Sequence, residues 1–339
     1  MNEKTSVQDT RDAVSRRNLF CGAGASAVGL ALASLTSPAA AAPPTQAPGR
    51  TKVFIRTVKE ARLFDLSPVW DEHSPIASVN PPFSMELVST HQNTISQFDG
   101  HLSFAAEVMH FSGQHGAPSI DAIGHIGRDG KLFGGVDAFA ATSDLRGIGR
   151  SGVGAHLDIA HYPTDILVNR GVLLDVARFI QGDLSPLPAG FEITAKHLAD
   201  TAGAQKVELE RGDTVLIRTG WGKFFTDDPN LYKGSASPGP SVDGAQFLVD
   251  RGARVVGNDT LTFEKRPPLI FSPQFQIFPV HMLLIADNGI NIIENFFLEE
   301  IGAAQIYDFL LVVPPLKIRG GTGSALRAFA LAPDAPPAG

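Results

Sequence analysis

An alternation of short apolar runs with helix-forming stretches is the feature that most limits how this chain can fold. The clearest case is SVDGAQFLVDRGARVVGND at 241–259, where a helix-forming segment is followed by a glycine and then by a β-branched apolar run. Ser241 is a typical helix N-cap, and Gly252 is a typical residue just beyond a helix C-terminus. A helix followed by a buried strand is the repeating step of α/β layer folds. The sequence therefore predicts the α/β class.

The same reasoning locates other elements along the chain. Helices are predicted over 194–202, with Thr194 as N-cap, and over 241–251. Long segments rich in Pro, Gly and Ser, at 66–101 and 223–241, are predicted to be loops, which often carry functional sites. Strands are predicted in KVFIRTV (52–58), RGVLLDVARFI (170–180), DTVLIRTGW (213–221), ARVVGND (253–259), INIIEN (290–295) and FLLVVPPLKI (309–318).

Composition and length limit the kind of binding partner and the number of domains. The 339 residues are 43% hydrophobic and 19% charged, with a formal net charge of −7. These values are typical of a globular chain with a full core, and the lack of a basic excess argues against nucleic acid as a partner. The length allows one or two domains, and we favour one, because α/β folds of this size are often single units.

The N-terminus has the composition of an export signal. Arg16-Arg17 precede a weakly apolar, uncharged run, and four alanines at 39–42 follow it as a small-residue cleavage site. This order predicts a bacterial twin-arginine signal over 1–42, and hence a periplasmic or secreted protein. The alternative, a membrane-anchoring helix, is less favoured because the run is shorter than the roughly 20 residues of a membrane span. We expect a linker at 43–52, one domain at 53–333 and a flexible tail at 334–339.

The single cysteine limits the metal chemistry that the exported protein can use. Cys21 lies inside the predicted signal, so the mature chain would contain neither a thiol nor a disulfide. Any bound metal must therefore be held by His, Asp and Glu.

The run HGAPSIDAIGH at 115–125 is the first candidate for such a site. If it is extended, His115, Ser119, Asp121 and His125 project to one face, because side chains alternate along a strand. Imidazole and carboxylate at this spacing suit Zn²⁺ or Mn²⁺. On spacing alone, one surface histidine and one core histidine would be an equally good interpretation.

The run also resembles a family signature. It is similar to His-x-Gly-Thr-His-x-Asp-x-Pro-x-His of the cyclase family of metal-dependent hydrolases, which includes kynurenine formamidases and isatin hydrolases. Further segments resemble that family in the same order, over about residues 60 to 331. They are FDLSPVW (64–70), HIGRDGKLFGG (125–135), RGVLLDV (170–176), RGDTVLIRTGW (211–221), FPVHMLL (278–284), IIEN (292–295) and KIRGGTGSALRAFAL (317–331).

The resemblance implies a fold, a site and an activity. The fold would be the kynurenine formamidase-like swivelling β/β/α single domain, assembled as a homo-oligomer. His115 and Asp121 would bind a first divalent ion, Zn²⁺ or Mn²⁺, and Asp121, His281 and Glu294 a second or shared one. His125 would be the general acid/base beside a metal-bound water that attacks a small cyclic or aromatic amide, lactam or ester. Without the resemblance, His281 would also fit a core histidine and Glu294 a buried, partnered carboxylate.

The sequence departs from the family pattern at Ser119, where the family has a ligand histidine. Three outcomes stay open: one ion held by the remaining ligands, a substitute ligand such as His110 or Glu107, or loss of catalysis. The alternative function is accordingly a non-catalytic, exported small-molecule-binding protein on the same scaffold.

Other stretches are weaker candidates. GGTGS at 320–324 is predicted to be a tight turn rather than a phosphate loop, because no lysine follows it. His156 and His161 are five residues apart, which does not favour one helical face, so no metal pair is predicted there. Aromatic residues near the family motifs are expected either to line an apolar pocket or to pack; they are Trp70, Trp221, Phe224 and Phe225.

Overall fold

The computed structural model describes residues 49–78, 80–97, 100–112, 118–142, 152–154 and 156–333. The predicted export signal with Cys21, the C-terminal tail and His115 lie outside the described residues. Within them, no helix is both long enough and apolar enough to cross a bilayer.

A nine-stranded mixed sheet forms the centre of the fold, in the order β1-β17-β15-β7-β9-β11-β14-β4-β16. Its four central strands β7, β9, β11 and β14 are mutually parallel, and the flanking strands pair antiparallel. The bounds are β1 Arg62–Asp65, β4 Ser119–Asp121, β7 Val168–Leu174, β9 Thr214–Ile217, β11 Val255–Asn258, β14 Asn291–Glu294, β15 Asp308–Val312, β16 Gly323–Ala325 and β17 Phe329–Ala332.

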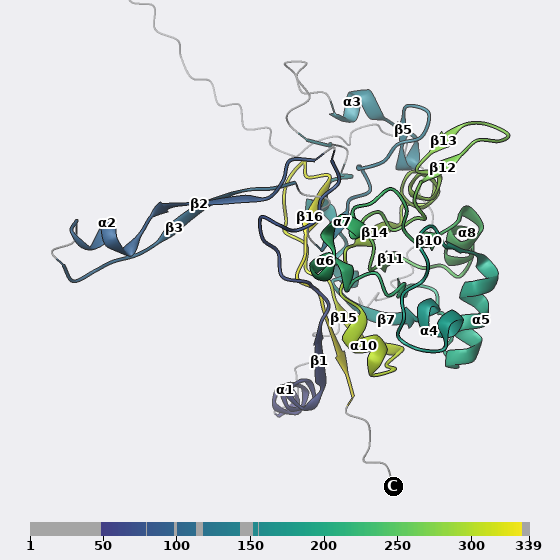
Figure 1. Cartoon of the computed structure of the whole chain (residues 1–339), viewed down its shortest axis with the longest axis horizontal. Helices are drawn as coiled ribbons and strands as arrows, with labels where there is room; N and C mark the ends of the chain where they lie inside the picture. The colour runs from purple at the N-terminus through teal and green to yellow at the C-terminus, as the bar shows by residue number, and fades with distance from the viewer. Residues whose placement is uncertain are drawn as a thin grey trace, which may run out of the picture. The chain divides into compact units, whose positions relative to one another are not determined.

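Helices α4 (Val176–Gln181), α5 (Ala195–Gln205) and α8 (Val242–Asp250) lie together on one side of the sheet, as Figure 1 shows. Leu198 of α5 and Leu248 of α8 are fully buried there against the strands. A second core covers the opposite face, and it includes Ile120 of β4 and Ile293 of β14. Both faces of the central strands are therefore covered, as expected for parallel strands that consist of continuous apolar runs.

Smaller elements surround these layers. The other helices are α1 (Arg50–Glu60), α2 (His91–Ile95), α3 (Ala138–Thr142), α6 (Phe224–Asp227), α7 (Pro229–Tyr232), α9 (Pro279–His281) and α10 (Glu299–Ala303). Turns of 3₁₀ helix occur at Phe133–Gly135, Ile159–His161 and Thr164–Ile166, and a π-helix spans Met282–Asp287. Two-stranded ladders join β2 (Ser84–Ser89) to β3 (Ala106–His110), β5 (Lys131–Leu132) to β6 (Val136–Asp137), β8 (Glu192–Ile193) to β10 (Gly239–Pro240) and β12 (Leu269–Ile270) to β13 (Gln276–Ile277).

The capping predictions for the two long helices are confirmed. The Thr194 side chain accepts from the His197 amide at the start of α5, and Ser241 accepts from the Gly244 amide at the start of α8. Gly252 follows α8 with a φ of 76°, a left-handed conformation that glycine adopts without steric cost. Local capping chemistry was thus sufficient to place these helices.

The predicted strand at 52–58 is wrong, because these residues belong to α1. No residue of α1 is buried, so this segment does not contribute to the core as a sheet strand would. The predicted strand at 170–180 is correct only as far as Leu174. Asp175 then caps α4 by accepting from the Arg178 amide, which turns the chain into a helix.

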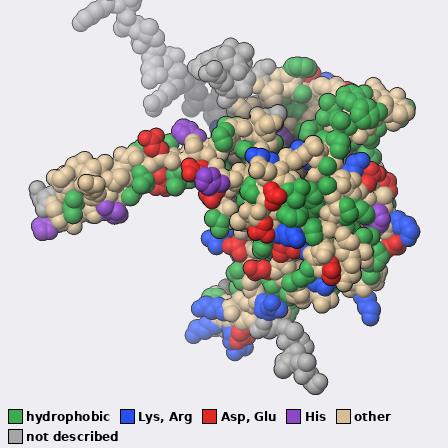
Figure 2. Space-filling view, viewed as in Figure 1, with side chains coloured by type: hydrophobic (Ala, Val, Ile, Leu, Met, Phe, Trp, Pro, Cys, Tyr) green, Lys and Arg blue, Asp and Glu red, His purple; other side chains and the backbone are tan. Residues whose placement is uncertain are grey.

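The segments predicted as loops contain regular structure. The range 66–101 includes β2 and α2, and 223–241 includes α6, α7 and β10. The hairpin arm, defined here as β2, α2 and β3 over residues 84–110, extends away from the main sheet in Figure 1. Its exposed apolar side chains include Met85, Leu87, Val88, Val108 and Met109, and Figure 2 shows such side chains along its length.

Candidate metal centre

Asp121, His281 and Glu294 form a buried cluster of potential metal ligands. One ligand atom from each side chain lies within 4.8 Å of the other two, and this is the one such cluster among the described residues. The His281 Nε2 atom is 3.2 Å from Glu294 Oε1 and 3.9 Å from Asp121 Oδ2. Two carboxylates and one imidazole thus face a common point.

Strand pairing explains why the two carboxylates meet. β14 and β4 are antiparallel neighbours, with Glu294 opposite Ser119 and Ile293 opposite Ile120. Ile120 and Ile293 project into one core, so the residues that alternate with them project to the other face. Asp121 and Glu294 therefore share a face of the sheet.

His281 reaches the cluster from the start of a helix. Phe278 adopts a φ of 54°, Pro279 begins α9, and the chain continues directly into the π-helix Met282–Asp287. Proline at the first helical position and a left-handed residue before it fix the direction in which the helix begins. π-helical turns are rare and often occur at functional sites.

Glu264 is a residue of this site that the sequence did not reveal. Its Oε1 atom accepts from His281 Nδ1 at 2.5 Å and from the His281 amide at 3.1 Å, and its Oε2 atom accepts from the Val280 amide at 3.3 Å. A carboxylate on Nδ1 leaves Nε2 as the atom that faces Glu294 and Asp121, which is how metal-binding histidines are commonly oriented. No motif contains Glu264; the only sequence signal is an acid between two apolar segments.

The charge of these four side chains favours a cation. Asp121, Glu264 and Glu294 are each at most 2% exposed, so three carboxylates surround one imidazole in a buried space. Burial by itself lowers the pKa of His281, but hydrogen bonds to Glu264 and Glu294 outweigh it and raise the pKa to about 10. Buried carboxylates are stable when they are paired or coordinate a metal. The donor set of imidazole nitrogen and carboxylate oxygen fits a divalent ion such as Zn²⁺ or Mn²⁺.

His125 lies at the edge of the cluster rather than on the same strand. Its amide donates to the Ala122 carbonyl at 2.9 Å, so the chain turns directly after Asp121. The run is therefore not extended beyond Asp121, and the condition under which His125 would share one strand face with Asp121 is not met. The side chain is 22% exposed, and its Nε2 atom is 4.0 Å from Asp121 Oδ1. An imidazole in this position contacts both the cluster and solvent.

Comparison with known proteins assigns the family. The Cyclase family model matches residues 52–265 of this chain. The chain belongs to the cyclase family. It is 27% identical to isatin hydrolase of Roseibium aggregatum over 288 residues, which covers 81% of this chain and 94% of the relative.

Solved structures agree with the cyclase assignment. The crystal structure of a cyclase with 26% identity has a TM-score of 0.69 and covers 84% of this chain and 92% of its own. An isatin hydrolase bound to the product analogue thioisatinate, at 20% identity, has a TM-score of 0.61 and covers 86% and 100%. The α/β single-domain fold implied by the sequence resemblance is confirmed, and the chain is a metal-dependent hydrolase of the cyclase type.

This cyclase departs from its family pattern at Ser119, and the structure shows where that residue lies. Ser119 is 2% exposed and directly opposite Glu294, on the same face of β4 as Asp121. The suggested substitutes, His110 and Glu107, lie on exposed strand β3 of the hairpin arm and do not join the cluster. Among the described residues, Asp121, His281 and Glu294 thus remain as the candidate ligands.

The aromatic residues near the cyclase motifs mostly pack. Trp221 is 2% exposed and its Nε1 donates to the Leu187 carbonyl, while Phe225 stacks edge-on against Tyr232. Half-buried Trp70 contacts Phe83 and Phe111, with ring centroids 4.5 and 5.0 Å away. Phe224 stacks edge-on against Trp221.

Proposed function

We propose that this protein hydrolyses the carbonyl C–N or C–O bond of a small cyclic or aromatic amide, lactam or ester. The observation that carries the proposal is the buried cluster of Asp121, His281 and Glu294 with His125 at its edge. The names of the relatives support a cyclic aromatic lactam as the first substrate to test, since they include isatin hydrolases.

In this proposal Asp121, His281 and Glu294, together with His115 of the family motif, hold a divalent ion, Zn²⁺ or Mn²⁺. A bound ion of this kind polarises a carbonyl group and lowers the pKa of water, which makes hydrolysis feasible near neutral pH. Glu264 keeps the Nδ1 proton on His281 and so presents Nε2 as the donor atom.

His125 is the residue proposed to move the proton. An imidazole changes its charge near neutral pH, so it can accept a proton during attack and return it to the leaving nitrogen or oxygen. Its partial exposure gives it contact with a substrate, and its distance of 4.0 Å from Asp121 Oδ1 keeps it outside the ligand set.

The test combines substrate screening with ion analysis. Small lactams, amides and esters, including isatin, are incubated with the protein and added Zn²⁺ or Mn²⁺. We expect His281→Ala to lose both ion and activity, and His125→Gln to lose activity while the ion remains. His197→Gln is the matched control, because glutamine at this position preserves the capping box of α5. A folded wild-type protein that binds no ion would refute the hydrolase and favour a small-molecule-binding role.

We also propose that the protein is exported by the twin-arginine route and acts in the periplasm or outside the cell. The support is the sequence of residues 1–42, with its paired arginines, apolar run and alanine-rich end. Replacing Arg16 and Arg17 by lysine should retain the protein, unprocessed, in the cytoplasm. Equal export of the variant would contradict the proposal.

A homo-oligomer is proposed on the basis of the hairpin arm. A two-stranded ribbon is only marginally stable alone, and this one exposes Met85, Val88 and Met109. We propose that a second copy of the chain packs against these exposed side chains, because homo-oligomers with twofold symmetry are the commonest assemblies. Light scattering should give a dimer or larger, and Met85→Asp combined with Val88→Asp should shift it to monomer. A monomeric wild-type protein would refute the homo-oligomer but not the proposed hydrolase function.

A further inference from the structure

A tight turn brings two histidines into contact outside the metal centre. The Nδ1 atom of His156 is 2.7 Å from the Nε2 atom of His161, and the rings meet edge-on with centroids 4.4 Å apart. His156 has a φ of 61° and Ile159–His161 is a 3₁₀ turn, so the chain folds back on itself within five residues. His156 and His161 therefore meet although they are five residues apart, because the segment is a turn and not an α-helix.

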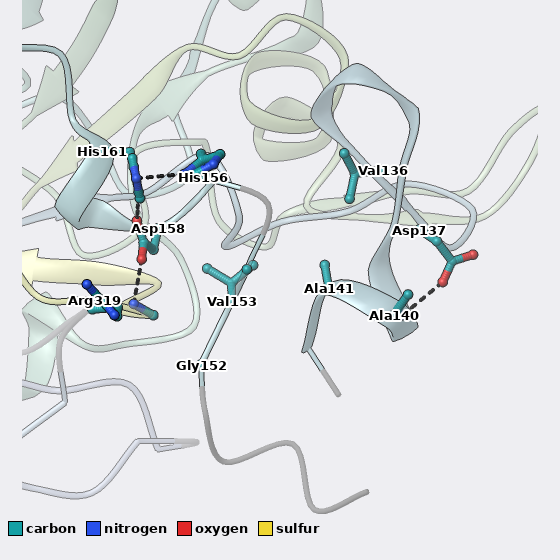
Figure 3. A pocket seen from close by; sticks show the side chains of 12 residues that line it. Val136, Asp137, Ala140, Ala141, Gly152, Val153, His156, Asp158, His161 and Arg319 are labelled. Atoms are coloured by element: carbon teal, nitrogen blue, oxygen red, sulfur yellow. Dashed lines mark hydrogen bonds and ion pairs between the residues drawn. The ribbon is translucent and has the colours of Figure 1, made fainter. Parts of the chain in front are cut away.

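Asp158 completes the group. One of its oxygens bonds to Nδ1 of His161, and Figure 3 shows His161 joined to both His156 and Asp158 on the wall of a cavity. This cavity has a volume of about 760 Å³, and Arg319 and Asp137 also line it. The Asp137 carboxylate accepts from the Ala140 amide on another part of the wall in the same view.

The GGTGS turn holds this group in place. The Gly320 amide donates to Asp158 Oδ2 at 2.6 Å, and the Ile159 amide donates to the Gly321 carbonyl at 2.8 Å. Gly152 packs so closely on Gly320 that a Cβ atom would lie 2.0 Å from the Gly320 oxygen. Burial raises the pKa of Asp158, but hydrogen bonds from Gly320 and His161 outweigh it and lower the pKa. Asp158 is therefore a fixed carboxylate.

A fixed carboxylate determines which nitrogen of His161 is available. Because Asp158 accepts the Nδ1 proton, the Nε2 atom carries the lone pair, and this lone pair faces His156. In metal sites, a histidine ligand is commonly oriented in this way: a carboxylate accepts the proton of one ring nitrogen, and the other ring nitrogen faces the metal. The 2.7 Å separation is that of a hydrogen bond, in which one of the two facing nitrogens donates its proton to the other. A divalent cation can replace that proton.

We propose that His156 Nδ1 and His161 Nε2 form a second metal site, which binds a divalent transition ion such as Zn²⁺. With Zn–N bonds of about 2.0–2.1 Å and tetrahedral angles, the two nitrogens must lie about 3.3 Å apart. The present 2.7 Å requires a small rotation of the exposed His156 ring. Water from the open cavity completes the coordination, and the positive charge of Arg319 makes this site weaker than the buried cluster.

This site is distinct from the Asp121 cluster but close to the loop that carries His125. The Gly124 amide donates to the Leu157 carbonyl at 2.7 Å, which joins the two turns. The proposal does not depend on the hydrolase activity, because none of its ligands belongs to the catalytic set.

The experiment disables the Asp121 cluster and then measures the Zn²⁺ binding that remains elsewhere in the protein. Zn²⁺ is titrated calorimetrically into the full-length His281→Ala protein, in which we expect one equivalent to bind. Adding His156→Gln should weaken this binding by at least about 100-fold, and adding Asp158→Asn by about 10- to 100-fold. His197→Gln, added to the same background, should leave it unchanged.

Crystals of the wild-type protein soaked in Zn²⁺ provide a test that does not depend on any variant. An anomalous peak between His156 and His161 supports the site, and a filled Asp121 cluster with no peak there overturns it. Equal Zn²⁺ binding with and without His156→Gln also overturns it. If the wild-type protein shows this peak but hydrolyses none of the tested substrates, the proposed hydrolase function is refuted and the second metal site is not.

Discussion

The role of Glu264 can be tested by replacing it with glutamine. Glu264 Oε1 accepts from both His281 Nδ1 and the His281 amide, and Oε2 accepts from the Val280 amide. A glutamine oxygen on the His281 side can keep the first two bonds. Its NH₂ group then faces the Val280 N–H, so one buried donor loses its acceptor.

The expected effect has two parts. A buried donor without an acceptor reduces stability by about 1–3 kcal/mol. Loss of the carboxylate from a metal-binding histidine typically lowers ion affinity by about 10- to 100-fold, which corresponds to about 1.4–2.7 kcal/mol. The substitution also removes a charge that raises the pKa of His281, so protons compete less with the ion and part of the loss is offset.

The assay is competition with a chromophoric zinc chelator across a pH series, together with urea unfolding of the metal-free protein. Glu192→Gln is the matched control, because Glu192 is half exposed and its ion pair with Lys265 lies at the surface. If Glu264→Gln binds the ion as tightly as wild type at every pH while the fold is intact, the orienting role of Glu264 is refuted.

Three further predictions concern the ligand set and the core. Ser119→His should raise ion affinity by about tenfold or more by adding an imidazole opposite Glu294; unchanged affinity in a folded variant would show that position 119 does not face the ion. Because the pKa of His281 is raised from 6.5 to about 10, this group stabilises the metal-free fold fully below pH 6.5 and loses that contribution as the pH rises towards 10. Over the same range ion affinity should increase by about tenfold per pH unit, because ion binding displaces one proton. Calorimetry in buffers of different ionisation enthalpy should detect this proton, and ion binding without proton release would contradict the prediction. Arg218→Met should destabilise the protein by about 3 kcal/mol or more, because the buried Asp175 carboxylate loses the positive charge of its Arg218 partner. In the same urea unfolding assay, Arg254→Met at the surface should change stability by less than about 1 kcal/mol. Equal effects of the two substitutions would contradict this prediction.

Local chemistry in the sequence was sufficient for several elements. Thr194 and Ser241 marked helix starts because a hydroxyl that caps a helix bonds to an amide only three residues away. The parallel strands were recognisable because they are buried on both faces and are continuously apolar. These features depend on neighbours in the chain, so the sequence alone contains them.

Features that depend on distant neighbours were missed or misassigned. The 52–58 run has a strand-like composition, yet it forms part of helix α1, in which no residue is buried. The loop predicted at 66–101 instead contains β2 and α2 of the hairpin arm, and β2 exposes apolar residues on the surface. For β2 the decisive fact is that β3 lies alongside and pairs with it.

The site divides in the same way. The sequence by itself determined the residue types and, through the family motif, the identities of Asp121, His281 and Glu294 as candidate ligands. Only the tertiary structure brought Glu264 to His281 and placed Ser119 opposite Glu294, because these contacts join residues separated along the chain. It also brought His156 to His161, through a left-handed residue that helical spacing does not anticipate. Chain-local patterns encode which groups are present, whereas strand pairing and turns decide which of them meet.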